Sequence, residues 1–302
     1  MRKDMKVAVL IDAENISSKY AHTILQEASS LGNVIYKRIY GNWTSTQLGP
    51  WKKQLLDHAI QPIQQYSNTA GKNSSDSALI IDAMDLLYQG KLDAFCIVSS
   101  DSDFTRLASR LRESEMYVLG IGEQKTPRSF ISACNKFVYL DVVYAEQERK
   151  DQKRKRKSDE NKDREKAASA AKEETTPKTS TKQASKDRVA EAKHAKAAPE
   201  KTTSAEVEEF DDKHAYSDGT DIVEVTDALI NILEEYSDDE GWMAASNLAS
   251  LLSRRLNDFD TRNFGFKKFV PFVQSLKIFE DRSVAPSDDP NARAIFFRLI
   301  ED

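Results

Sequence analysis

Cysteine is scarce in this sequence of 302 residues, which contains only Cys96 and Cys134. Neither belongs to a CxxC pair or to a cluster of cysteine and histidine, so the sequence predicts neither a disulfide framework nor a zinc site. Long hydrophobic runs are also missing, because the apolar segment near the N-terminus is short and ends at an acidic residue. We therefore expect a protein of a reducing, cytoplasmic compartment that has no membrane partner.

Glycine-rich phosphate loops are missing as well. The first apolar run, KVAVLIDA, is followed by neither GxGxxG nor GxxxxGK[ST]. Such loops hold phosphates through backbone N–H groups in nucleotide-binding α/β proteins. Their absence from the sequence disfavours a nucleotide-binding regulator as the function class.

A long central segment has almost no large apolar residues. Between Glu146 and Lys201 there is a single Val189 and no Phe, Trp, Tyr, Leu, Ile or Met, while 18 Lys and Arg accompany 12 Asp and Glu. Such a segment cannot bury enough apolar surface to offset its chain entropy. We therefore predict a folded domain at 1–145, a disordered charged linker at 146–220 and a second folded domain at 221–302.

In the N-terminal region, short apolar and β-branched runs alternate with helical stretches. The runs with strand character are KVAVLIDA, NVIYKRIY, AIQPIQQY, LDAFCIVSS, MYVLGIG and KFVYLD. Helices are predicted at about 17–30, 51–58, 75–88, 103–113 and 127–135. The alternation predicts an α/β fold with a mainly parallel sheet and helices on both faces, and burial from both sides explains the continuous runs VAVLI and AFCIV.

The C-terminal region has a different pattern. Three helical stretches precede the strand-like runs KIFEDRS and ARAIFFRLI, and the connection VAPSDDPN is rich in turn residues. This order predicts a small winged helix-turn-helix domain.

Acidic residues follow two of the predicted strands. Asp12 and Asn15 come just after the first strand, and Asp101 and Asp103 come just after LDAFCIVSS. Between them, Asp76 begins a helix that should pack beside these strands. Because ligands of open α/β sheets bind beyond the carboxyl ends of the strands, we expect these side chains to meet at one edge of the sheet.

Carboxylates at such short range repel one another unless a cation shares the site. A set of oxygen ligands without His or Cys suits Mg²⁺ or Mn²⁺ better than Zn²⁺. The chemistry that such a site supports is phosphodiester hydrolysis, in which the metal ion activates a water molecule and neutralises charge on the phosphate.

Helix capping is the alternative role for Asp76 and Asp103, because both precede predicted helices. Asp12 is harder to explain structurally, since a carboxylate at the end of a buried apolar strand needs a partner to offset its desolvation. Asp82 and Asp85 lie further along the helix of Asp76. The advance of about 100° per residue turns them away from its face, and we expect them to be solvated or to support the site indirectly.

Three ordered motifs, VLIDAEN, GKNSSDSALIIDAMDLL and FCIVSSDSDFTRLASRLRESEMYVLGIG, resemble the NYN domain, a branch of the PIN-like nuclease fold. The resemblance spans about residues 5–141. It implies an RNA substrate and a divalent metal ion, with Asp12, Asp76 and Asp101 as ligands, Asp103 as a fourth ligand and Asn15 assisting. Some PIN-like domains only bind, so a noncatalytic RNA- or protein-binding adaptor is the alternative to a ribonuclease.

Three basic residues near the predicted site are candidates to position RNA phosphates. They are Lys72, Arg106 and Arg128. Phosphate contacts of this kind fix the register of a nucleic acid without reading its bases. Ordinary solvated surface is the alternative for each residue.

The C-terminal region resembles the LOTUS domain, also called OST-HTH, through GW, LLSRRLNDFD and NFGFKKFVPFVQSL. Five basic residues cluster around the turn between its helices, namely Arg254, Arg255, Arg262, Lys267 and Lys268. RNA binding through phosphate contacts is the favoured function, although Asp and Glu outnumber Lys and Arg in this region. A protein partner is the alternative, and nothing in the sequence indicates a homo-oligomer.

Overall fold

The structure is a computed structural model that describes residues 5–66, 74–152, 219–284 and 293–300. Lys72, most of the turn VAPSDDPN and most of the predicted linker lie outside these residues. The described start of that linker, residues 146–152, belongs to a helix that begins at residue 140. Helical structure therefore continues past the predicted domain boundary. In the described part of the chain, no helix has the length and apolar character that crossing a membrane requires.

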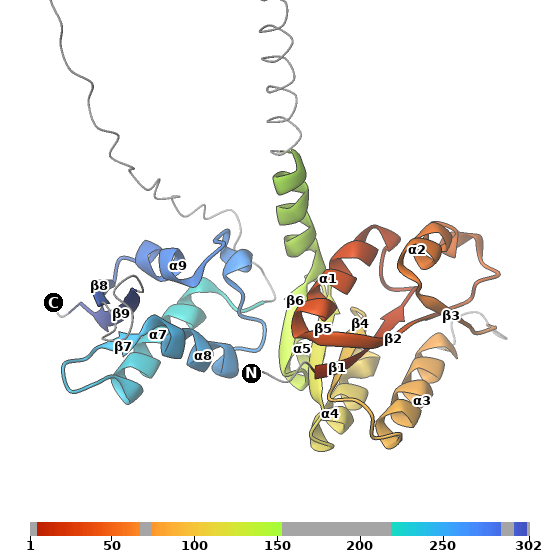
Figure 1. The fold of residues 1–302 in the computed structure, drawn as a ribbon, viewed down its shortest axis with the longest axis horizontal. Coiled ribbons are helices and arrows are strands. Elements are labelled where there is room, and N and C mark those ends of the chain that lie inside the picture. Colours follow the sequence, from red (N-terminus) through yellow and green to blue (C-terminus); the bar gives the residue numbers. More distant parts are fainter. Residues whose placement is uncertain (1–4, 67–73, 153–218, 285–292, 301–302) are drawn as a thin grey trace, which may run out of the picture. The chain divides into compact units, whose positions relative to one another are not determined.

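The N-terminal region contains six parallel strands in the order β3-β2-β1-β4-β5-β6 (Figure 1). The strands are β1 (Met5–Asp12), β2 (Gly32–Gly41), β3 (Gln61–Gln64), β4 (Ala94–Val98), β5 (Tyr117–Gly122) and β6 (Lys136–Tyr139). This confirms the predicted parallel sheet. The strand order reverses its direction between β1 and β4, and such a switch point is where loops diverge and open α/β sheets bind ligands.

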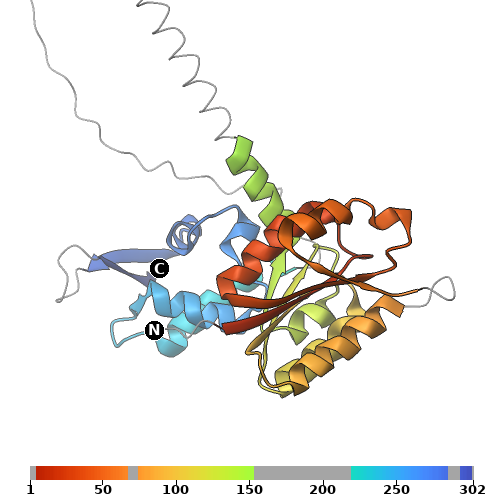
Figure 2. The ribbon, with the colours of Figure 1, turned by 45° about the vertical axis from the view of Figure 1, so that its right-hand side comes forward.

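Helices cover both faces of this sheet, as predicted (Figure 2). One face packs against α1 (Ala21–Leu31), α2 (Trp51–His58) and the start of the helix at 140–152. The other face packs against α3 (Ser74–Tyr88), α4 (Thr105–Glu113) and α5 (Arg128–Ala133). Two predicted helices begin with a short 3₁₀ turn. In one, η1 (Ser18–Tyr20) precedes α1, and in the other, η3 (Ser102–Phe104) precedes α4. A third 3₁₀ turn, η2 (Thr46–Leu48), precedes α2.

The alternation of side chains along β1 explains why its sequence is apolar throughout. Val7, Val9 and Ile11 belong to the core on one face, whereas Ala8 and Leu10 belong to the core on the other. All five are fully buried. The next residue is Asp12, the last of the strand, so its carboxylate lies at the edge of the sheet directly after the buried core residues.

The C-terminal region is a small helical domain with a three-stranded antiparallel sheet in the order β7-β9-β8. Its elements are α7 (Ile222–Tyr236), β7 (Met243–Ala244), α8 (Ala245–Arg255), η5 (Thr261–Phe264), α9 (Phe269–Ser275), β8 (Phe279–Val284) and β9 (Ala294–Leu299). The predicted helices and hairpin are confirmed. The side chains of Leu248, Leu252, Phe272 and Phe297 are fully buried in its core.

Candidate metal centre

The acidic residues lie where the strand order reverses. Asp12 is the last residue of β1, and Asp101 and Asp103 lie at the start of η3, just after β4. Asp76 is in the first turn of α3, which packs against the face formed by Ala8 and Leu10. Residues separated by nearly ninety positions in the sequence are thus brought together because β1 and β4 are neighbours in the sheet.

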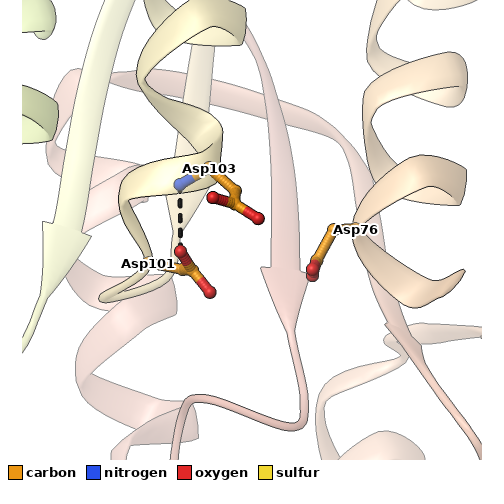
Figure 3. Close-up of side chains that lie close together, drawn as sticks. All are labelled: Asp76, Asp101 and Asp103. Atoms are coloured by element: carbon orange, nitrogen blue, oxygen red, sulfur yellow. Dashed lines mark hydrogen bonds between the residues drawn. The ribbon is translucent and has the colours of Figure 1, made fainter. Parts of the chain in front are cut away.

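Three of these carboxyl groups form a close cluster. Asp76, Asp101 and Asp103 each place a carboxylate oxygen within 4.8 Å of the others, and Figure 3 shows them facing one another from α3 and η3. Asp76 is buried, Asp101 is partly exposed and Asp103 is exposed. The acidic cluster, as we call these three residues, is therefore open to solvent on the side of Asp103, where a large substrate could reach it.

Local backbone geometry orients two members of the acidic cluster. The N–H of Asp103 donates a hydrogen bond to Oδ1 of Asp101 at 2.9 Å, so Asp101 is the N-cap of η3 (Figure 3). Capping was the alternative role considered for Asp103, but the N-cap of η3 is Asp101. Capping and ligand roles are compatible, because a carboxylate has a second oxygen and further lone pairs to offer.

Asp12 lies beside the acidic cluster rather than within it. Its Oδ1 accepts hydrogen bonds from the N–H groups of Glu14 at 3.1 Å and Asn15 at 3.3 Å. Its Oδ2 accepts from the Asn15 amide at 2.7 Å and from the Ser99 hydroxyl at 2.8 Å. Burial raises the pKa of Asp12 above its ordinary value, although these hydrogen bonds oppose the effect. Asn15 thus orients the Asp12 carboxylate.

The pKa of Asp76 reflects the crowding of negative charge in the acidic cluster. Burial, followed by the negative charges of Asp12, Asp101 and Asp103, raises the pKa of Asp76 to about 7. A cation among these oxygens would remove the repulsion and keep all the carboxylates ionised. The donors are carboxylate oxygens only, and they fit a hard divalent ion such as Mg²⁺ or Mn²⁺.

Two residues that the sequence did not single out support the acids. Ser99 donates its hydroxyl to Asp12 and accepts a hydrogen bond from the N–H of Asp101 at 3.1 Å, so it links the ends of β1 and β4. Glu14 accepts a hydrogen bond from the Ser75 hydroxyl at 3.1 Å and adds negative charge near Asp76. Their positions within VLIDAEN and VSSDSDF were the only available signal.

Asp82 and Asp85 lie outside the acidic cluster, as expected from the helical rotation. Asp85 is exposed. Asp82 is instead partly buried and accepts hydrogen bonds from the Arg38 guanidinium and the Tyr40 hydroxyl, both on β2. Asp82 therefore joins α3 to β2.

The predicted RNA-contacting residues fall into two groups. Arg106, Arg128, Arg254, Lys267 and Lys268 are exposed. Arg106 lies in the first turn of α4, three residues after Asp103.

The two remaining arginines pair with acids of their own domain. Arg255 faces Glu235 at 3.4 Å. Arg262 is partly buried and contacts Asp260 at 2.7 Å. Burial alone would raise the pKa of Asp260, but its hydrogen bonds with Arg262 and that positive charge hold the pKa below its ordinary value. Arg262 therefore has a structural partner that the sequence did not reveal.

Comparisons with known proteins cover both folded regions. Residues 6–141 match the family model of the NYN domain, and residues 221–284 match that of the OST-HTH/LOTUS domain. No curated protein matches the chain. Among solved structures, a protein of unknown function from Vibrio parahaemolyticus RIMD 2210633 is 18% identical with a TM-score of 0.41, covering 47% of this chain and 97% of its own.

Proposed function

We propose that this chain, which carries an NYN domain followed by an OST-HTH/LOTUS domain, is a divalent-metal-dependent ribonuclease. The observation that carries the proposal is the acidic cluster at the switch point of the sheet. Its place in a domain of a nuclease superfamily makes phosphodiester hydrolysis the chemistry that fits best.

In this proposal, Asp76, Asp101 and Asp103 hold the metal ion, which would be Mg²⁺ or Mn²⁺. When bound, such an ion activates water and neutralises charge that develops on the phosphate oxygens. Asp12, which the resemblance also implies as a ligand, would add its negative charge beside these three residues. The side chains of Asn15 and Ser99 hold its Oδ2, and the N–H groups of Glu14 and Asn15 hold its Oδ1. Arg106 would hold a phosphate of the RNA next to the acidic cluster.

The purified full-length chain should cleave labelled RNA when Mg²⁺ or Mn²⁺ is present. This cleavage should stop when EDTA is added. Both single-stranded and structured RNAs should be tested, with DNA of the same sequence alongside. Cleavage that persists in EDTA would contradict the metal requirement. RNA binding with no cleavage in either metal would instead support the noncatalytic adaptor.

The OST-HTH/LOTUS domain is proposed to bring RNA to the nuclease through Arg254, Lys267 and Lys268. Their side chains are exposed, whereas Arg255 and Arg262 pair with acids. Phosphate contacts by a few cations give an affinity that depends strongly on salt concentration. A protein partner for this domain is the alternative outcome.

Replacing Lys267 and Lys268 together with alanine should weaken RNA binding and flatten its salt dependence. For two lost contacts to single-stranded RNA, the slope of log affinity against log salt should fall by about 1.4. Fluorescence anisotropy over a range of salt concentrations measures both effects. The matched control is the alanine double variant of Lys52 and Lys53, two adjacent exposed lysines on α2. Equal losses in both double variants would contradict a specific role for the OST-HTH/LOTUS domain.

A further inference from the structure

A cavity of about 540 Å³ lies in the NYN domain beside the acidic residues. Its walls come from the segments that follow β1, β2 and β5, which all end at the same edge of the sheet. Asn15 lines this cavity and also donates its amide to Asp12, so the cavity and the site of the acids share a wall. Glu123, on another wall, donates its N–H to the Ser100 hydroxyl at 2.9 Å, next to Asp101.

The cavity combines an apolar floor with a polar rim. Ile16, Leu48 and Trp51 are nearly fully buried and form the apolar part of the lining. The indole N–H of Trp51 donates to the carbonyl of Ile16 at 3.2 Å, which fixes this floor. Asn42 and Gln47 add amide groups, and amides can hydrogen-bond the edge of a nucleobase.

The charge of the lining indicates which part of a nucleotide would enter. Glu14, Glu123 and Lys125 line the cavity, and Lys125 forms an ion pair with Glu123 at 2.9 Å. The lining therefore has a net charge of −1, carried by Glu14, and this charge would repel a phosphate from the interior. An uncharged ribose and base, which present hydroxyl and amino donors to carboxylates, would be accepted.

We propose that this cavity, which we call the nucleoside pocket, binds the ribose and unpaired base of one RNA nucleotide next to the scissile phosphate. The proposal rests on the proposed ribonuclease function and specifies its substrate. A base can enter a concave pocket only after it leaves the stack of a duplex. The substrate is therefore single-stranded RNA, or a single-stranded segment of a folded RNA.

The test uses full-length chain and a single-stranded RNA in which every uridine is 4-thiouridine, with Ca²⁺ present. Irradiation should cross-link the RNA to the peptide that contains Asn15, and the same RNA in a duplex should not cross-link there. Replacing Gln47 with tryptophan fills the nucleoside pocket and should abolish this cross-link. The matched control is Thr46→Trp, because Thr46 is exposed on the same short turn but does not line the pocket.

The outcomes separate the nucleoside pocket from the nuclease function. The nucleoside-pocket proposal would be overturned by either of two results. One is a cross-link near Asn15 that is equally strong in the Gln47→Trp variant, and the other is no cross-link there in the unchanged protein. RNA cleavage alongside either result would leave the nuclease function standing. If Gln47→Trp removes the cross-link, Thr46→Trp does not, and the protein cleaves no RNA, the nucleoside-pocket proposal would be supported and the ribonuclease proposal would be overturned.

Discussion

Replacing Asp101 with asparagine is expected to lower RNA cleavage by at least about 100-fold, because loss of even an outer partner of a metal ligand typically costs 10- to 100-fold. The fold should persist. Asparagine is as good an N-cap as aspartate, so its side-chain oxygen can still accept the N–H of Asp103. RNA binding should be unchanged or slightly tighter, because the substitution removes a negative charge.

The matched control for this variant is Asp85→Asn, which makes the same chemical change at an exposed position of α3 outside the acidic cluster. Initial cleavage rates and RNA affinity should be measured for both variants in the same Mg²⁺ buffer. Cleavage by Asp101→Asn within about twofold of the unchanged protein would be inconsistent with a ligand role, given the losses expected for metal sites.

The second large effect concerns pH and the stability of the metal-free protein. Burial and neighbouring negative charges raise the pKa of Asp76 from 3.8 to about 7. A folded-state pKa above the unfolded value means that the folded state binds the proton more tightly. This contribution to stability is fully present at pH below about 4 and is lost as the pH rises through 7. The melting temperature of the metal-free protein should therefore fall between pH 5.5 and pH 8.

Binding of Mn²⁺ should restore the stability that the metal-free protein loses as the pH rises. An ion that binds only the folded state at 100 times its Kd stabilises it by about 2.7 kcal/mol. Protons compete with the ion for Asp76, so the rise in melting temperature on adding Mn²⁺ should be larger at pH 8 than at pH 5.5. Differential scanning calorimetry measures both quantities, with EDTA in the metal-free samples.

The Asp76→Asn variant should show a weaker dependence on both pH and Mn²⁺, since the titrating group and one ligand are gone. Asp85→Asn again serves as the control. An equal Mn²⁺ effect at pH 5.5 and pH 8 in the unchanged protein would contradict proton competition at this site.

Much of the fold followed from local patterns in the sequence. The alternation of strand-like runs with helical stretches was sufficient to predict a mainly parallel sheet, and the acids after β1 and β4 were sufficient to predict a shared edge. The helix at 140–152 was not predicted, because residues 140 and 141 end the strand-like run KFVYLD and composition marks residues 146–201 as a charged linker. Upstream, Val143 is buried and Tyr144 packs against the core, which anchors the start of this helix.

The candidate site was predictable in its residue types but not in its hydrogen bonds. The sequence could not show that both oxygens of Asp12 would be held by Asn15, Ser99 and backbone N–H groups. Nor could it show that Arg262 would pair with Asp260. Such partners depend on side-chain geometry that neither hydrophobic periodicity nor motif spacing records.

Calorimetric titration of Mn²⁺ into the full-length chain at pH 8 tests most directly whether the acidic cluster is a metal centre. The proposal predicts a Mn²⁺ site that survives in Asp85→Asn and is lost or greatly weakened in Asp101→Asn. Equal binding by all three proteins, or no binding by the unchanged protein, would contradict it.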